Sequence, residues 1–339
     1  MTTTVVENDV DNALVADQAR EITTKVDRPD LIFRGIIRTS GIAVLTVMSL
    51  IGVFLAYRAA KALDVAGWSF VTEQAWEPDS GKFGVAAIIV GTVLIAVVAI
   101  CIAVPLAIAV ALYISEYAPR RLQSTFVSLV DLMAAVPSIV YGLWGFFFLQ
   151  SNVTGVARWI STYFGWIPFL SVEGADPTDP LSPSTVYTSS TFIAGIVVAL
   201  MVAPIICSVM REVFSQAPSG EREGAYALGS TKWGMIRTVV LPFGKGGMIG
   251  GTMLGLGRAL GETIAVYLII SPVFIIQPRI LESGTSSVAS LIALRYGEAT
   301  NFGTSALMAA GLALFLMTLV VNFIASSVVA RSRSGAESG

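Results

Sequence analysis

Residues Phe83 to Ser115 read FGVAAIIVGTVLIAVVAICIAVPLAIAVALYIS, a run of 33 residues without a charged side chain. A helix that crosses the hydrocarbon core of a bilayer needs about 20 such residues. The whole chain of 339 residues has the same character, because 55% of it is hydrophobic, only 13% is charged, and its mean hydropathy is +0.76. Most of the chain therefore has lipid as its solvent.

Outward from this run, further apolar stretches predict an all-α, multi-pass membrane protein with six transmembrane helices. The predicted spans are residues 39–57, 84–114, 124–149, 187–210, 247–275 and 304–330. They form one six-helix domain, 34–332, between a polar N-terminal tail, 1–33, and a C-terminal tail, 333–339. The acidic start of the chain does not resemble a signal peptide.

Lysine and arginine set the expected orientation, because cytoplasmic loops are enriched in them. With the N-terminus in the cytoplasm, 14 of these residues fall on the cytoplasmic side and 6 on the outer side, and Arg258 lies inside a span. Both termini are therefore predicted to be cytoplasmic, which agrees with six spans. The long segment 211–246 then becomes a cytoplasmic loop, and 58–82 and 150–186 become outer loops.

Composition excludes several kinds of chemistry. The chain has no histidine, so the commonest general base and metal ligand are missing. Cys101 and Cys207 sit in apolar runs and are expected to pack rather than to react. No catalytic residue, metal site or cofactor is expected. The net charge of −2 gives no excess of basic residues with which the chain could bind nucleic acid.

The fifth predicted span is rich in glycine, with small residues four positions apart at Gly247–Gly251, Gly251–Gly255 and Gly257–Gly261. Such spacings let helix backbones approach closely in lipid. The pattern is compatible with tight packing inside one bundle, or with a subunit interface or a thin-walled pathway.

The cytoplasmic loop contains the stretch Glu223 to Pro242, EGAYALGSTKWGMIRTVVLP. It resembles the EAA loop of ABC-importer permeases. The residues that match the pattern are Glu223, Ala225, Gly229, Val239, Leu241 and Pro242, whereas Gly224 stands in place of an alanine. The local sequence predicts a short helix that ends at Gly229, with Ala225 and Leu228 on one face.

This resemblance implies that loop 211–246 docks on a separate ATPase subunit, with Glu223, Ala225, Gly229, Leu241 and Pro242 as the coupling residues. The chain itself has no phosphate-binding loop of the G-x-x-x-x-G-K-[ST] type. The chain is therefore not expected to be an enzyme.

Three further stretches, Pro105–Pro119, Asp131–Phe147 and Gly257–Val266, resemble the permeases of bacterial phosphate importers, and most of all their PstC members. The resemblance implies type I ABC-importer architecture in the bacterial cytoplasmic membrane and uptake of inorganic phosphate by alternating access. The implied partners are a PstA-like permease, two PstB-like ATPase subunits, a PstS-like external binding protein and the lipid bilayer. Molybdate or sulfate as substrate, a homodimer in place of a heterodimer, and an ion-coupled secondary transporter remain open alternatives.

Three charges fall inside predicted spans. Arg258 and Glu262 are four positions apart, so a continuous helix would place them on one face as a pair. Charges at membrane depth usually mark a transport pathway, and the arginine fork suits an oxyanion. The pair can equally be a structural ion pair, although the resemblance favours a pathway role. Asp131 is either a further pathway residue or a hydrated group near the cytoplasmic interface.

Overall fold

The computed structural model describes residues 28–174, 176, 178–179 and 182–333 and divides the chain into two units, Met1–Ile51 and Gly52–Gly339. In the first unit the described residues belong to helix α2 (Arg28–Ala66), which continues into the second unit. Helix α2 therefore begins inside the predicted tail 1–33, at Arg28, while residues 1–27 lie outside the described part. The C-terminal tail prediction likewise falls outside it, except for Arg333, the last residue of helix α14 (Asn301–Arg333).

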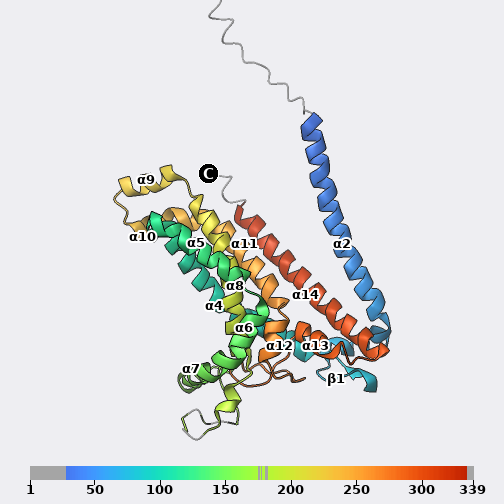
Figure 1. The fold of residues 1–339 in the computed structure, drawn as a ribbon. Coiled ribbons are helices and arrows are strands. Elements are labelled where there is room, and N and C mark those ends of the chain that lie inside the picture. Colours follow the sequence, from blue (N-terminus) through green and yellow to red (C-terminus); the bar gives the residue numbers. More distant parts are fainter. Residues whose placement is uncertain (1–27, 175, 177, 180–181, 334–339) are drawn as a thin grey trace, which may run out of the picture. The chain divides into compact units, whose positions relative to one another are not determined.

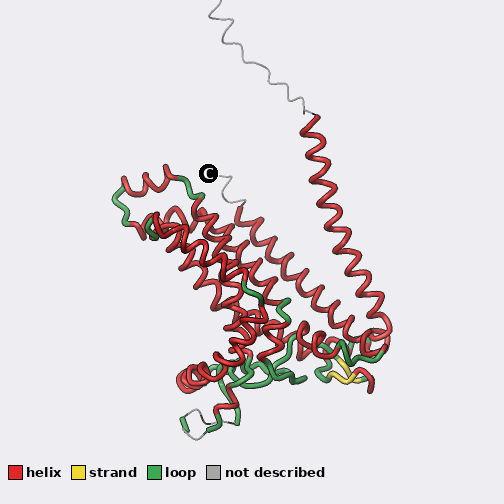
Figure 2. Tube along the Cα trace, in the orientation of Figure 1, coloured by secondary structure: helices red, strands yellow, loops and turns green. Residues whose placement is uncertain are grey.

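The second unit is predominantly helical (Figures 1 and 2). Its spanning helices and their extensions are α4 (Ala86–Leu112), α5 (Arg120–Ala135), α6 (Ser138–Trp144), α7 (Gln150–Phe164), α8 (Thr191–Ser215), α11 (Leu241–Leu260) and α14 (Asn301–Arg333). The shorter helices are α3 (Ser69–Thr72), α9 (Ser219–Ala227), α10 (Lys232–Met235), α12 (Ile264–Ile269) and α13 (Val288–Arg295). Three wide π-turns, η2 (Tyr113–Tyr117), η3 (Gly145–Leu149) and η5 (Ile236–Val240), join neighbouring helices, and η1 (Pro78–Ser80) and η4 (Ser184–Tyr187) are 3-10 turns.

Five helical segments of the described chain are long and apolar enough to cross a membrane. A sixth span results if the pair Arg120–Ala135 and Ser138–Phe164, bent by 86° at its break, counts as one. The predicted class, an all-α protein with several membrane helices, is confirmed. Strand structure among the described residues is limited to the hairpin of β1 (Trp76–Glu77) and β2 (Lys82–Phe83), in which Trp76 pairs with Phe83.

Three predicted segments differ from the structure. The span 124–149 is not one straight helix, because Val136 and Pro137 adopt extended backbone conformations between α5 and α6. Proline disfavours helical geometry in the residue before it, which explains the break. The predicted outer loop 150–186 begins with α7, since the helix continues to Phe164. The span 247–275 ends early: α11 stops at Leu260, α12 covers only Ile264–Ile269, and an irregular loop follows.

The core of the second unit is built around α8, whose side chains are buried on several faces by α4, α11 and α12. Helix α4 turns a row of buried alanines towards this core, namely Ala96, Ala99, Ala103, Ala107 and Ala111. Small side chains allow two helix axes to approach closely, which compensates in lipid for a weak hydrophobic driving force.

The glycines of α11 pack on the same central helix. A side chain added at Gly244, Gly247 or Gly255 would meet Phe214, Val213 or Ile206 of α8 at 2.4–2.5 Å. Gly250 and Gly257 lie on another face of α11, and nothing stands within 4 Å of the position of an added Cβ there. The glycine pattern therefore serves packing inside one bundle on one face of α11, while another face is left open.

Loops of the second unit are segregated by end. The hairpin β1–β2, the described loop residues between 165 and 190 and the loop after α12 gather at one end, and α9 lies with the C-terminal end of α14 at the other (Figures 1 and 2). The first of these ends is held together by backbone hydrogen bonds from Ile280 to Phe169 and from Ser283 to Val186, and by an ion pair of Arg279 with Glu173. This segregation is the arrangement that alternating spans produce, and the side that faces the cytoplasm stays a prediction.

Candidate functional site

The predicted coupling loop is shorter than 211–246, because α8 continues to Ser215 and a continuous helical segment starts at Lys232. Between them lies α9, which is followed after Leu228 by a left-handed residue, Gly229, at φ +82°. The amide of Gly229 donates to the carbonyl of Tyr226 at 2.9 Å, and that of Ser230 donates to Ala225 at 3.1 Å. These two bonds form a Schellman motif, so the predicted helix end at Gly229 is confirmed.

The surface of α9 differs from the predicted docking face. Ala225 is half-buried and packs against the core, whereas Leu228 is 90% exposed. The two side chains therefore do not share a face as predicted, because Leu228 lies at the helix end, where the chain turns. Tyr226, Glu223 and Trp233 are exposed as well, so a mixed apolar and acidic surface is presented at this end of the unit.

Pro242 sits in the first turn of α11, directly after the π-turn η5. Proline has no amide to donate to the preceding turn, and a wide turn accommodates that loss without breaking the helix. Leu241 and Pro242 thus belong to one helical segment, Lys232–Leu260. The predicted coupling residues are brought to the same end of the unit, and their role in docking stays a prediction.

An ion pair that the sequence analysis missed fixes α9 to the spanning helices. Arg222 Nη1 lies 3.1 Å from Glu116 Oε1, and its Nη2 donates to the carbonyl oxygen of Phe214 at 2.7 Å. The side chain of Glu116 is only 4% exposed. The sequence signal was a carboxylate at the end of the longest apolar run and an arginine beside the EAA-like stretch, 106 positions apart.

Two spanning segments are broken, and the helices that follow the two breaks lie against each other. The first separates α5 from α6 at Val136–Pro137, and the second separates α11 from α12 at Gly261–Thr263. The helices that follow the breaks pack tightly, since a Cβ added at Gly142 of α6 would lie 2.8 Å from Cα of Ala265 in α12. Backbone outside regular helices is tolerated at membrane depth only where protein buries it or where it lines a cavity.

Arg258 lies in the last turn of α11, just before the second break, and its side chain is exposed. It occupies the open face of that helix, with Leu254 and the unobstructed Gly257. Glu262 lies in the break itself, where its carboxylate accepts a hydrogen bond from the amide of Ala265 at 3.2 Å. It thereby caps the start of α12.

The predicted i, i+4 geometry of Arg258 and Glu262 is wrong, because the helix ends at Leu260 between them. Among the described residues the two side chains form no ion pair. Asp131 lies on α5, where its carboxylate accepts a hydrogen bond from the Ser208 hydroxyl of α8 at 3.2 Å. The structure thus places Arg258 and Glu262 at one break, and their transport roles and that of Asp131 stay predictions.

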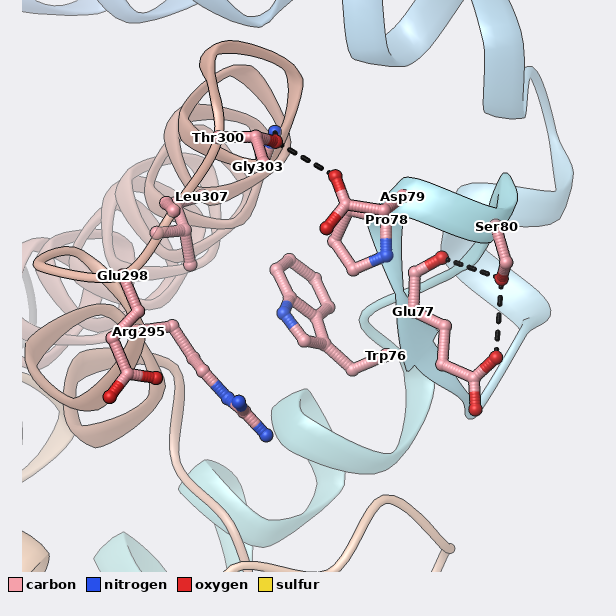
Figure 3. Close-up of a pocket in the computed structure, with 11 residues that line it drawn as sticks. Trp76, Glu77, Pro78, Asp79, Ser80, Arg295, Glu298, Thr300, Gly303 and Leu307 are labelled. Carbon is pink, nitrogen blue, oxygen red and sulfur yellow. Dashed lines mark hydrogen bonds between the residues drawn. The ribbon is translucent and has the colours of Figure 1, made fainter.

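A separate cavity of about 460 Å³ opens at the loop-rich end (Figure 3). It lies between the β1–β2 hairpin and the connection of α13 to α14, and Arg295 extends into it beside Trp76. The Thr300 hydroxyl donates to Asp79 at 2.8 Å across it. None of the residues singled out from the sequence lines this cavity.

Comparison with known proteins agrees with this architecture. Residues 103–334 match the family model described as binding-protein-dependent transport system inner membrane component. The chain is 37% identical over 312 residues to the phosphate transport system permease protein PstC 2 of Mycobacterium tuberculosis, covering 91% of this chain and 94% of that protein. It is also 37% identical to PstC of Xylella fastidiosa, with coverage of 90% and 91%.

A solved bacterial ABC transporter involved in the import of alginate has a chain that superposes with a TM-score of 0.50 at 16% identity. The match covers 88% of this chain and 98% of that one. Identity this low reports the fold alone, and that fold is the type I ABC-importer permease. The chain therefore belongs to the family of binding-protein-dependent transport system inner membrane components, and within it to the PstC permease proteins.

Proposed function

We propose that this chain is a permease subunit of an ATP-driven importer that carries inorganic phosphate into a bacterial cell. The observation that carries the proposal is the position of Arg258, an exposed cation on the open face of α11 beside a helix break. A charge facing lipid at membrane depth is costly. The open face is therefore best explained by a polar pathway, bounded on its far side by a second permease subunit.

The chemistry of Arg258 fits an oxyanion. The guanidinium group always carries its charge and offers parallel hydrogen bonds to two oxygens of one phosphate. Among the described residues Glu262 forms no ion pair with Arg258, and its carboxylate instead accepts a hydrogen bond from the amide of Ala265. The cation is thus free to attract an anion, and Glu262 acts by holding the break in shape rather than by competing for Arg258.

The other subunits of the proposed importer are inferred from the family to which the chain belongs. The loop that carries Glu223 and Gly229 docks on an ATPase subunit on the cytoplasmic side, and an external binding protein delivers phosphate to the other side. ATP-driven movement of the α9 region tilts the spanning helices and alternates access to Arg258. Both termini then lie in the cytoplasm.

A second oxyanion is the main competing substrate. Molybdate and sulfate present the same paired oxygens to Arg258, so this residue does not discriminate among them. Phosphate is favoured because the relatives that cover nine-tenths of the chain are named as phosphate transport permeases.

The test is uptake of radiolabelled phosphate by cells that express the complete importer with Arg258→Ala, Arg258→Lys or, as a control on the same helix, Lys245→Ala. A hydrogen bond to a charged group contributes about 1.5–3 kcal/mol, so uptake should fall about tenfold or more in Arg258→Ala and less in Arg258→Lys. Lys245→Ala should transport normally. Uptake in Arg258→Ala equal to wild type, in complexes assembled at the normal level, would refute the pathway role. Competition by excess sulfate or molybdate, but not by phosphate, would refute the substrate.

A further inference from the structure

The α9 helix has an unusual attachment to the rest of its unit. None of its side chains is fully buried, and its best-covered residues are Arg222 and Ala225. Apolar burial therefore contributes little to its position. Beside the packing of Ala225 against the core, α9 is held by the Arg222 side chain, whose exposed fraction is 22%.

Arg222 joins α9 to two spanning helices at once. One terminal nitrogen lies 3.1 Å from Glu116 Oε1 and 3.3 Å from Oε2, at the end of the α4–η2 segment. The other donates to the carbonyl of Phe214 in the last turn of α8. That carbonyl belongs to a helix end, where carbonyl groups lack partners inside the helix. A lysine in place of Arg222 could not span both acceptors with a planar fork.

A second contact holds the following helix to the same place. Lys232 Nζ of α10 lies 4.6 Å from the ring centroid of Tyr117, the residue next to Glu116. The η2 turn is thus contacted by Arg222 of α9 and by Lys232 of α10. This turn ends the α4 segment, since Ala118 directly after it is extended.

Because Glu116 is buried, the loss of one partner of the Glu116–Arg222 ion pair is costly. Removing one partner of a buried ion pair leaves an uncompensated charge, whereas neutralising both partners leaves none. We propose that the Glu116–Arg222 pair is the rigid link through which displacement of α9 is transmitted to α4 and α8. Glu116 and Arg222 are positioning residues in this proposal, which rests on the proposed function only for the identity of the force that displaces α9.

The link is tested by comparing Glu116→Gln, Arg222→Gln and the double variant in the complete importer. The matched control is Glu212→Gln, since Glu212 is an exposed carboxylate of α8 whose side chain accepts a hydrogen bond from Gln216 of the same helix. The readouts are recovery of the assembled complex, ATP hydrolysis without substrate, and the stimulation of hydrolysis by phosphate-loaded binding protein.

We expect each single variant to assemble and to hydrolyse ATP at the basal rate, while stimulation falls about tenfold. The double variant should recover part of that loss, because it buries no unpaired charge, and Glu212→Gln should behave as wild type. Assembly and stimulation that decline in parallel would show a merely structural pair. Undiminished stimulation in both single variants would overturn the proposal.

Hydrogen exchange of the isolated permease separates this inference from the proposed function. Exchange at the α9 amides should become faster in Glu116→Gln and not in Glu212→Gln, whatever the substrate is. If exchange is accelerated but the wild-type importer does not carry phosphate, the link stands and the proposed substrate fails. If exchange is unchanged, the link fails even where phosphate is transported.

Discussion

Replacing Gly229 by alanine tests how the coupling helix is terminated. Gly229 has φ +82°, a left-handed conformation in which a Cβ approaches the following carbonyl oxygen. An alanine there costs about 1–2 kcal/mol relative to glycine, although no atom lies within 4 Å of the added methyl group. The cost is thus conformational and not one of crowding.

The expected result is a local loosening of the end of α9. A cost of about 1–2 kcal/mol changes an opening equilibrium about 5–30-fold. The amides of residues 229 and 230, which close the Schellman motif by donating to Tyr226 and Ala225, should exchange hydrogen faster by this factor. Hydrogen exchange with mass spectrometry on the detergent-solubilised permease measures the change.

Gly224→Ala is the matched control, because Gly224 lies inside α9 and has no atom within 4 Å of an added Cβ. Alanine is favoured over glycine in a helix interior by about 0.5–1 kcal/mol, so exchange in α9 should become about 2–5-fold slower. The two glycine-to-alanine changes, five positions apart, are therefore expected to act in opposite directions. Equal exchange in Gly229→Ala and wild type would refute the reasoning that a left-handed residue ends this helix.

Two further predictions concern the core and the exposed loop. Gly244→Ala places a methyl carbon 2.5 Å from Cε1 of the fully buried Phe214, so the permease should lose about 1–3 kcal/mol of stability, seen as a lower thermal midpoint in detergent. Phe214→Leu in the same chain should restore part of it, and a midpoint unchanged by Gly244→Ala would contradict the packing argument. Glu223→Ala should leave the isolated permease within about 0.5 kcal/mol of wild type, because Glu223 is an exposed surface residue. The same variant should reduce co-purification of the ATPase subunit, and normal co-purification with normal coupling would end the docking role of Glu223.

The membrane spans were predictable from the length of the apolar runs in the sequence. The run from Phe83 to Ser115 and its counterparts give the number and order of spans once the bent pair counts as one. The breaks were not predictable to the same degree. Pro137 is compatible with a kink or a full break, and the observed break leaves α6 packed against α12. The end of α11 before Gly261 was not predictable either, because the sequence of this helix contains several other glycines that do not end it.

The candidate site shows the same division. The end of α9 at Gly229 follows from local chemistry and was predicted. The pairing of Arg258 with Glu262 was predicted from spacing and is wrong, since spacing has meaning only within a continuous helix. The Glu116–Arg222 pair joins residues 106 positions apart, and no local pattern reports such a contact. Long-range contacts of this kind depend on how α4, α8 and α9 are brought together.

The glycine face of α11 has a mechanical consequence. Side chains on helices usually form ridges that interlock with the grooves of a neighbour, so sliding requires many rotamer changes. Along Gly244, Gly247, Gly251 and Gly255, α11 presents bare backbone to the side chains of α8. Each of these glycines leaves a notch, and Phe214, Val213 and Ile206 of α8 fill the notches at Gly244, Gly247 and Gly255. The two helices are therefore locked in register along this face, and a movement of one wall of the bundle has to carry α8 and α11 together as one body.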